Sequence, residues 1–285
     1  MKTRVSSAKK EVLIGDDRPT VLIGERINPT GKKKLAAALQ AGDMDLVRQE
    51  ALAQVQAGAD ILDVNVGVAG LDEVALLPQA VQVVIEAVDV PLCLDSHDPK
   101  ALAAALKVYR GKAIVNSVSG QEQSLNEILP LVEQYGAAVI GLTMDDEGIP
   151  KDAERRSKIA HKIVARAEAL GIPREDVIMD CLALTIATEG QAVLVTLEAI
   201  RRVRAELGVN QTLGASNISF GLPDREVLNG TFLALAIAAG VTCPTVDAAK
   251  VRPSVLATDL LLGHDDYAMR YIRAFRQRQQ AAKPQ

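Results

Sequence analysis

The stretch Ile61-Leu62-Asp63-Val64-Asn65 is a short apolar run that stops at an acid and then at an amide. Eight runs of this kind occur along the chain, and 222 residues in seven intervals separate the first terminating acid, Glu25, from the last, Asp247. Each interval averages about 32 residues, the length of a strand, a loop and a crossover helix. Eight such units predict an α/β fold of the (β/α)8 TIM-barrel type, whose chemistry lies where the strands end. The other runs are Val21–Gly24 before Glu25, Leu92–Leu94 before Asp95, Ala113–Val115 before Asn116, Val139–Met144 before Asp145, Val177–Met179 before Asp180, Leu213–Ser216 before Asn217, and Val246 before Asp247.

The length of the chain predicts a single domain. A barrel of roughly 250 residues fits within residues 1–285 and leaves short extensions at both ends. We expect residues 1–19 to form an N-terminal extension in which Glu11 to Gly15 is a short strand that closes the barrel bottom. The polar segment 277–285 is expected to be a frayed tail.

Helical periodicity follows each expected strand, with apolar residues recurring at spacings of three and four. Pro99 stands where a first helical turn tolerates proline, and Gly171 precedes Pro173 where a helix should end. The expected helices are 33–57 with a break near Gly42, 72–87, 99–109, 123–135, 152–170, 191–207, 224–239, and 251–275 with a break at Gly263.

Composition excludes several classes of protein. The net charge is −4, and aromatic residues make up 2% of the chain with no Trp, which argues against binding nucleic acid through a basic face or base stacking. No apolar stretch reaches the 18 or so residues of a membrane span, and no secretory signal begins the chain. The cysteines Cys93, Cys181 and Cys243 are too scattered for a metal site and are expected to be reduced in a cytoplasmic protein. No tightly bound metal is therefore expected.

Asp95, Asn116 and Asp180 close the third, fourth and sixth expected strands. A carboxylate at a narrow barrel mouth needs hydrogen-bond donors from the protein or from a ligand. Two carboxylates and an amide suit a flat heterocycle whose edge presents ring N–H and amino groups, above all the pyrimidine ring of a pterin. Capping of the neighbouring helices is the alternative for each residue alone, and the set on nearby strands favours the ligand.

Five motifs resemble those of the methyltetrahydrofolate methyltransferases. They are Gly24-Glu25-Arg26-Ile27-Asn28, Asp63-Val64-Asn65-Val66-Gly67, Leu92-Cys93-Leu94-Asp95-Ser96, Ile114-Val115-Asn116-Ser117 and Gly214-Ala215-Ser216-Asn217-Ile218-Ser219. That family includes the methyltetrahydrofolate:corrinoid/iron–sulfur protein methyltransferase and the folate module of cobalamin-dependent methionine synthase. The resemblance runs from about Leu22 to Asp247.

The resemblance implies a homodimeric barrel of the pterin-binding type. Asp95, Asn116 and Asp180 would hold the pterin of methyltetrahydrofolate or tetrahydrofolate, and Asn217 would be the catalytic residue beside the methyl-bearing nitrogen. The methyl acceptor would be the cobalt of a cobalamin on a separate corrinoid protein, such as a corrinoid/iron–sulfur protein, a demethylase corrinoid subunit or a methionine synthase module.

The chemistry of methyl transfer accounts for an amide at position 217. The departing pterin anion is very basic, so a group must donate a hydrogen bond to its nitrogen as the carbon–nitrogen bond stretches. Asn217 can donate that bond but cannot supply the proton, which would come from water or a nearby acid.

Other polar residues near the strand ends are candidates for folate contacts or for support of the site. For Asp145 and Asp146 a solvated acidic loop is an equal alternative, and Arg225 with Lys32–Lys34 could meet the glutamate tail of folate or simply form a charged surface. His97 departs from the small polar residue expected there in the corrinoid/iron–sulfur relatives and is expected to cap a helix or face solvent. The full set is Glu25, Asn28, Asp63, Asn65, Ser96, Asp145, Asp146, Ser219 and Arg225.

Two rival functions remain. Dihydropteroate synthase shares the pterin-binding barrel, but it requires a basic residue late in the seventh strand and an Arg–His pair ending the eighth, where this chain has Asn217 and Asp247. A folate-binding subunit without turnover is the other alternative, and failure to methylate cob(I)alamin would favour it.

Overall fold

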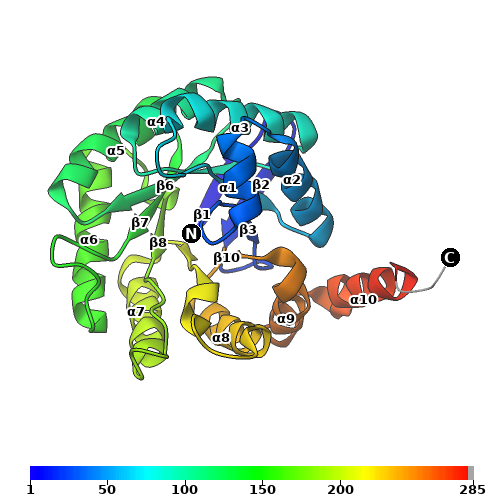
Figure 1. Ribbon diagram of the computed structural model, residues 1–285. Helices are drawn as coiled ribbons and strands as arrows, with labels where there is room; N and C mark the ends of the chain where they lie inside the picture. Colours follow the sequence, from blue (N-terminus) through cyan, green and yellow to red (C-terminus); the bar gives the residue numbers. More distant parts are fainter. Residues whose placement is uncertain (282–285) are drawn as a thin grey trace.

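The computed structural model describes residues 1–281, and its centre is a barrel of eight parallel strands (Figure 1). The sheet order is β10-β3-β4-β5-β6-β7-β8-β9. The seam between β9 and β10 is bridged where the Thr245 amide donates to the Leu213 carbonyl at 3.0 Å. The predicted TIM barrel is therefore confirmed. Its strands are β3 Ile23–Ile27, β4 Ile61–Asn65, β5 Leu92–Asp95, β6 Ile114–Ser119, β7 Ala138–Leu142, β8 Val177–Asp180, β9 Gln211–Thr212 and β10 Thr245–Val246.

Helices surround the barrel, and their positions agree closely with those expected from periodicity. The expected breaks near Gly42 and Gly263 both separate two helices. The helices are α1 Lys33–Gln40, α2 Asp45–Ala57, α3 Glu73–Ala87, α4 Pro99–Val108, α5 Glu122–Tyr135, α6 Ala153–Ala169, α7 Ala192–Leu207, α8 Arg225–Ala239, α9 Ala248–Leu261 and α10 Met269–Ala281, with 3-10 turns η1 Arg174–Asp176, η2 Ala215–Ser219 and η3 Asp266–Ala268.

Several strand predictions were wrong in position. Strand β3 begins at Ile23 and runs past Glu25 to Ile27, and β6 runs past Asn116 to Ser119. The seventh barrel strand is Gln211–Thr212, not Leu213–Ser216, and Asn217 lies in the 3-10 turn η2. Short-range backbone hydrogen bonds replace the sheet ladder there. The backbone N–H of Asn217 donates to the Gly214 carbonyl, and the backbone N–H of Phe220 donates to the Asn217 carbonyl. The fifth strand ends at Leu142, two residues before the expected Met144.

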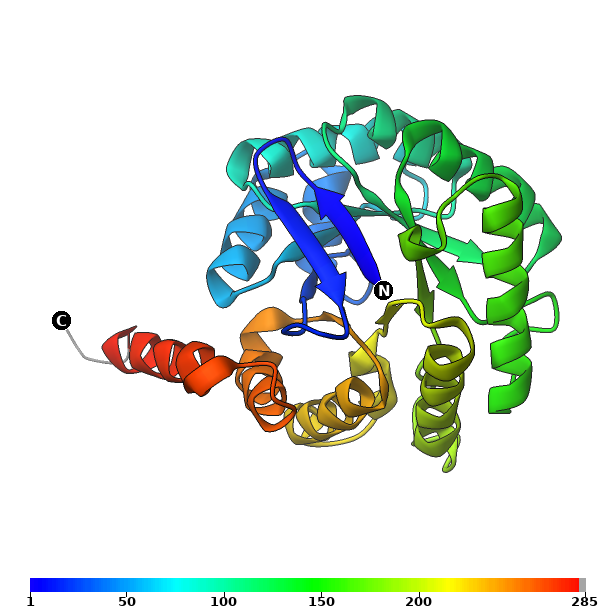
Figure 2. The same ribbon diagram turned by 180° about the vertical axis from the view of Figure 1, so that it is seen from behind.

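A hairpin closes one end of the barrel. The expected strand at Glu11–Gly15 is β2, and it pairs antiparallel with β1, Lys2–Ser6, which was not anticipated. Val5 and Ile14 are fully buried against the residues that line the barrel interior. Figure 2 shows the hairpin across the barrel end that faces away from the viewer in Figure 1. The N-terminal segment is thus part of the folded core.

The C-terminal segment differs in part from the expectation of a frayed tail. Residues 277–281 continue helix α10, and residues 282–285 lie outside the described part of the chain. Within residues 1–281, no helix combines the length and apolar character needed to cross a bilayer.

Candidate functional site

The inward-facing side chains change from apolar to polar along the strands. Ile61, Cys93, Ile114 and Ile178 belong to the apolar cluster inside the barrel. Strand side chains alternate with a period of two, so the next inward position on each of these strands carries a polar group. Those positions are Asp63, Asp95, Asn116 and Asp180, and the same step from Ile23 on β3 reaches Glu25. The polar layer is therefore the floor of the barrel mouth.

Three neighbouring strands place their polar residues at one level. Asn65 is in register with Asp95, and Asp95 is in register with Asn116. The Asn116 side-chain amide donates to Asp63 Oδ1 at 3.1 Å. The structure thus brings together four of the residues that the sequence singled out, from β4, β5 and β6.

The carboxyl groups of this layer hold protons more tightly than isolated acids. Burial and the nearby Asp95 carboxylate raise the pKa of Asp63 well above its ordinary value. Burial also raises the pKa of Asp95, against the opposing influence of Asn65 and His97. Two buried acids side by side disfavour each other's ionised form. Ligand N–H donors would supply the compensation that this layer lacks.

Asp180 stands at the end of β8 in a comparable environment. Burial raises its pKa to about 6, although the Leu182 and Gly214 amides act in the opposite direction. The Leu182 amide donates to Asp180 Oδ1 at 2.7 Å, which fixes the orientation of the carboxyl group. Asp180 therefore offers an oriented acceptor whose charge is sensitive to pH near neutrality.

Asn217 lies on the wall of an adjoining cavity of about 370 Å³. Glu25, Ser216 and Asn217 line it together with residues from the start of α8 and the end of β10. The Asn217 side chain is exposed. Within the described residues it has no hydrogen bond to another protein group, so its amide is available to a ligand.

Glu25 is the acid of this cavity. It accepts a hydrogen bond of 3.2 Å from the hydroxyl of Ser216, which is the residue that precedes Asn217 in the chain. Burial raises the pKa of Glu25, while Ser216 and the nearby Lys32 lower it. A carboxyl group whose pKa is raised thus lies in the same cavity as the Asn217 amide and is bonded to the residue that precedes Asn217.

The remaining candidate residues serve mainly as internal supports. Ser96 donates to Glu73 at 2.6 Å and accepts from the Asp98 amide, and Asn28 accepts from the Thr30 amide at 2.9 Å. Asn65, besides its place beside Asp95, accepts from the Gly67 amide at 2.8 Å.

Two further pairs of candidates lie in the loop after β7 and at the two ends of the loop that joins η2 to α8. Asp145 is paired with Arg155 at 3.0 Å, and Asp146 is exposed. Ser219 is buried and accepts from Arg225 Nε at 3.0 Å, and Arg225 also donates to the Ser216 carbonyl. Arg225 thus holds the turn that carries Asn217.

His97 is exposed at the mouth, and the cap of α4 is Asp98, which accepts from the Lys100 amide. Its surface position agrees with one of the two expected roles. Arg26, within the first of the five motifs, donates to Glu50, 3.1 Å away, and lies 3.9 Å from Asp247.

Sequence reasoning missed Arg156, which is buried beneath the loop that follows Asp180. Its guanidinium donates to the carbonyls of Cys181 and Leu182, to the Pro150 carbonyl and to the Thr196 hydroxyl. A lone Arg within an amphipathic helix gives no signal of burial, because only the fold brings those carbonyls to it.

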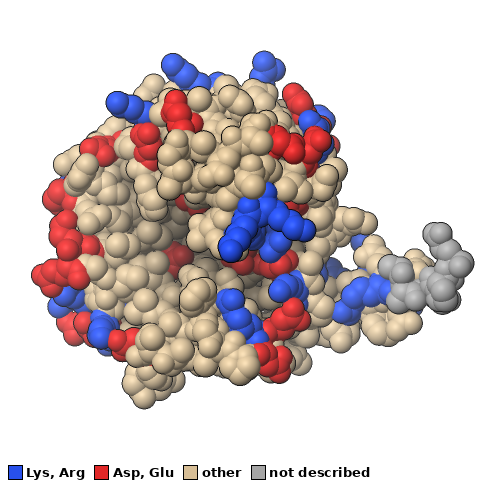
Figure 3. Space-filling model, viewed as in Figure 1, with Lys and Arg blue, Asp and Glu red and all other residues tan. Residues whose placement is uncertain are grey.

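Figure 3 shows the face of the barrel mouth, which is hollowed, with acidic side chains inside the hollow and basic side chains gathered over α1. The basic group in this region is Lys32, Lys33 and Lys34. Lys32 also lines the 370 Å³ cavity. Among residues 1–281, no cluster of three or more His, Cys, Asp or Glu side chains suits a metal ion.

A family model described as "Pterin binding enzyme" matches residues 24–247, and the chain belongs to that family. A methylcorrinoid:tetrahydrofolate methyltransferase of Eubacterium limosum is 33% identical over 267 residues, which cover 90% of this chain and 96% of that protein. A methionine synthase of Mycobacterium tuberculosis is 33% identical over 87% of this chain, which corresponds to 22% of the synthase.

Solved structures agree with the fold. A dihydropteroate synthase of Yersinia pestis with a pterine-sulfa conjugate has a TM-score of 0.70 at 15% identity, covering 92% of this chain and 99% of that one. The synthase of Xanthomonas albilineans with 4-aminobenzoic acid has a TM-score of 0.69 at 18% identity, over 91% of this chain and 98% of that one. At such identities the likeness concerns the barrel alone.

Proposed function

We propose that this protein is a methyltransferase that moves a methyl group between 5-methyltetrahydrofolate and the cobalt of a corrinoid carried on a separate protein. The observation that carries the proposal is the combination of an acceptor-rich polar layer at Asp63, Asp95, Asn116 and Asp180 with the unpaired amide of Asn217 on the adjoining wall. The first matches the donor edge of a pterin, and the second matches the nitrogen from which the methyl group departs. The 33% identity to a methylcorrinoid:tetrahydrofolate methyltransferase supports the same reaction.

In this proposal the polar layer binds and orients the pterin. Ring N–H and exocyclic amino groups donate to Asp95 and Asp180, and Asn116 contacts the same edge while its amide remains bonded to Asp63. The ligand donors replace the water that the buried carboxyl groups lose, so binding and ionisation of these acids support each other.

At the methyl-bearing nitrogen, Asn217 donates a hydrogen bond that strengthens as charge develops. The carbon–nitrogen bond breaks with its electron pair left on nitrogen, and a proton must reach that nitrogen to give tetrahydrofolate. Glu25, whose pKa is raised by burial and which is bonded to Ser216, is the acid of the same cavity that would relay a proton to that nitrogen. The corrinoid supplies the cobalt nucleophile, and this chain supplies position and electrostatics.

The corrinoid protein approaches the barrel mouth, since the methyl group lies there. It could be a corrinoid/iron–sulfur protein or a demethylase corrinoid subunit. We also propose a homodimer and a cytoplasmic location, and the buried, unpaired thiols Cys93, Cys181 and Cys243 fit a reducing compartment.

The test is a spectroscopic assay in which the protein is mixed with cob(I)alamin and methyltetrahydrofolate under anaerobic conditions. Conversion to methylcobalamin is expected with the parent protein. Binding of the folate without conversion would instead assign a non-catalytic folate-binding subunit. Prior treatment with a chelator should leave the transfer intact, because the proposed site uses no metal held by this chain.

A second arm of the test addresses the pterin site. Asp180→Ala and Asn116→Ala should each weaken folate binding by about 1.5–3 kcal/mol, the usual contribution of a hydrogen bond with a charged partner. Asn126→Ala is the matched control, because Asn126 is an exposed amide on α5 that bonds Arg166 away from the mouth. Unchanged folate affinity in both site variants would overturn the pterin assignment.

A further inference from the structure

A second cavity, of about 220 Å³, lies at the end of the barrel opposite the mouth. Its walls come from the linker 15–20 between β2 and β3, from Arg204 on α7, from the end of α8 with the residues that follow it, and from the loop between α9 and η3. These segments lie where the barrel strands begin, on the side that Figure 2 turns toward the viewer. The cavity is therefore separate from the site proposed for folate.

The uncharged polar groups of this cavity are already used within the protein. The Thr20 hydroxyl donates to Asp259 at 2.7 Å, and the Thr242 hydroxyl accepts from the Gln211 amide at 3.1 Å. Two carbonyl groups in the last turn of α8 are capped by the Gly240 amide. What the lining has left to offer a ligand comes from its cationic side chains.

Two arginines of the lining carry guanidinium groups that the protein leaves largely unpaired. Among residues 1–281, Arg18 donates a hydrogen bond only through Nε, to Asp17 at 3.3 Å. The one ion pair of Arg204 in the same part of the chain is with Asp16, at 3.8 Å, which is longer than a hydrogen bond. The Arg204 stem lies close to Gly240, where a β-carbon would come within 2.9 Å of Arg204 Cδ. The absence of a side chain at Gly240 thus leaves room for this arginine.

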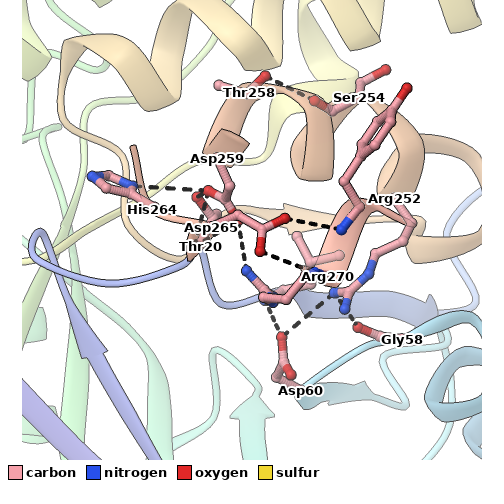
Figure 4. A network of polar contacts seen from close by, with 12 residues as sticks. Thr20, Gly58, Asp60, Arg252, Ser254, Thr258, Asp259, His264, Asp265 and Arg270 are labelled. Atoms are coloured by element: carbon pink, nitrogen blue, oxygen red, sulfur yellow. Dashed lines mark hydrogen bonds and ion pairs between the residues drawn. The ribbon is translucent and has the colours of Figure 1, made fainter. Parts of the chain in front are cut away.

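His264 adds an imidazole from the loop after α9. Its Nδ1 is buried without a hydrogen-bond partner among the described residues and lies 4.0 Å from Oδ1 of Asp259. Figure 4 shows the ring beside Asp259, with its second nitrogen on the side away from that carboxylate. Asp259 already accepts from Thr20 and, at 3.0 Å, from Arg270, so its charge does not depend on the imidazole. The ring of His264 is therefore available to a ligand in the cavity that it lines.

We propose that this cavity binds a small anion that carries a phosphate or carboxylate groups, held by Arg18, Arg204 and His264. A guanidinium group presents its N–H donors in a planar fork that fits the oxygens of either group. Asp16 is the one acid among the lining residues, so the two guanidinium groups exceed it in charge even when the imidazole is neutral. This chemistry is the reverse of that at the barrel mouth, where buried acids require N–H donors from the ligand.

The first experiment titrates the parent protein with inorganic phosphate and, separately, with succinate, at constant ionic strength. Calorimetry gives the dissociation constants, and their ratio tells whether the site prefers a phosphate or a dicarboxylate. An anion present at about 100 times its dissociation constant should raise the melting temperature by about 5 °C, because it binds the folded chain alone. Absence of saturable binding with a dissociation constant below about 1 mM for either anion would overturn the proposal.

The second experiment changes the two arginines. Arg18→Met and Arg204→Met remove the charge and keep an unbranched stem, so each should weaken anion binding by about tenfold or more, as loss of a charged hydrogen-bond donor does. Arg202→Met is the matched control, because Arg202 belongs to α7 as well but pairs with Glu198 at 3.1 Å and does not line the cavity. Equal affinities in the parent and both cavity variants would place the anion elsewhere and overturn the proposal.

The third experiment tests the imidazole. His264→Phe keeps a ring and removes both nitrogens, and within residues 1–281 neither nitrogen makes a hydrogen bond to the protein. The variant should therefore bind the anion about threefold or more weakly while the melting temperature of the anion-free protein stays near that of the parent. A lower melting temperature with unchanged anion affinity would make His264 a structural residue and contradict its place in the site.

The last experiment locates the anion without any variant. Crystals of the parent soaked in selenate, whose oxygens are arranged as in phosphate, should show an anomalous selenium peak in the cavity beside Arg18 and Arg204. No peak there at a selenate concentration well above the dissociation constant measured by titration would overturn the proposal. None of these measurements needs folate or cobalamin, so their outcome is separate from that of the methyltransferase assay.

Discussion

Asn217 differs from the other polar residues of the site because its side-chain amide is exposed and, within the described chain, unpaired. Asp63, Asn116 and Asp180 are each tied to a protein group, which suits them to hold a ligand in one orientation. A free amide can follow a charge that appears only during the reaction. Binding and rate should therefore separate in variants of these residues.

For Asn217→Ala we expect the single-turnover rate of methyl transfer to fall by roughly 10²–10³, with little change in the folate dissociation constant. Loss of one donor to a developing anion typically has this effect. Asn217→Asp should be slower still, because an ionised carboxylate accepts and cannot donate. Stopped-flow transfer to cob(I)alamin at saturating folate, beside equilibrium titration, provides both numbers. A variant that binds poorly yet transfers at the parent rate once saturated would make Asn217 a binding residue only.

Ionisation of Asp180 should lower the stability of the ligand-free protein while it favours folate binding. Its pKa is raised from 3.8 to about 6 by burial, so the folded protein holds this proton more tightly than the unfolded chain does. The resulting stabilisation is full below about pH 3.8 and is lost as the pH rises through about 6. At pH 8 the charged carboxylate then destabilises the ligand-free protein by about 3 kcal/mol.

Asp180→Asn should accordingly raise the free energy of unfolding of the ligand-free protein at pH 8, and by much less at pH 4. The same substitution should weaken folate binding at pH 8, where the ionised acceptor is lost. Urea unfolding at the two pH values measures the first effect, and titration measures the second. Asp146→Asn, at an exposed acid, is the control. Equal gains at both pH values would contradict the role assigned to this carboxyl group.

At the scale of elements, the loop after β8 depends on α6. Leu182 has a φ of +59°, a left-handed conformation that is unfavourable for leucine, and the Leu182 amide is the group that orients Asp180. The buried guanidinium of Arg156 binds the carbonyls of Cys181 and Leu182 at 2.7 and 2.8 Å. Helix α6 therefore stabilises a backbone conformation that the local sequence disfavours.

Arg156→Ala should destabilise the protein by about 3–5 kcal/mol, because it leaves several buried carbonyl groups without a donor. The neighbouring Arg155→Ala removes only ion pairs that remain open to solvent, a partly buried one with Asp145 and an exposed one with Glu147, and should have an effect of about 0–1 kcal/mol. Chemical denaturation of the two variants gives a matched comparison. Similar losses in both would show that Arg156 is not an internal support.

At the scale of the whole molecule, the β1–β2 hairpin seals the barrel opposite the site. Ile14 is fully buried in the interior cluster that also holds Ile61, Cys93 and Ile178, immediately beneath the polar layer. Removing the plug would open this apolar cluster to water. The β1–β2 hairpin thus contributes both to the stability of the barrel and to the exclusion of water from beneath the polar layer.

Ile14→Ala should lower the free energy of unfolding by about 2–5 kcal/mol, the usual effect of a large-to-small change in a packed core. Leu13→Ala, on the opposite face of β2 and only half-buried, should have a clearly smaller effect. Differential scanning calorimetry of both variants is the measurement. A loss of unfolding free energy in Leu13→Ala as large as in Ile14→Ala would contradict the conclusion that the buried face of β2 closes the barrel.

The sequence by itself determined the barrel and the strand-end acids, because both follow from local periodicity. A repeat of about 32 residues sets strand and helix in turn, and a period of two along each strand puts Asp95 or Asn116 directly above the apolar layer. The positions of nearly all helices follow from the same kind of pattern. The acceptors at the strand ends indicated a pterin, and resemblance of the motifs added the methyl group, the corrinoid and the role of Asn217.

Only the tertiary structure decided the remaining features, because they depend on residues far apart in the chain. The hydrogen bond between Asn116 and Asp63, the burial of Arg156 beneath Asp180, and the cavity shared by Glu25 and Asn217 leave no periodic trace in the sequence. Leu213–Ser216 has the pattern of a strand, yet short-range hydrogen bonds turn this region into η2 and so set the position of Asn217. Local pattern fixes which face a residue occupies, whereas closure of the barrel fixes which side chains meet.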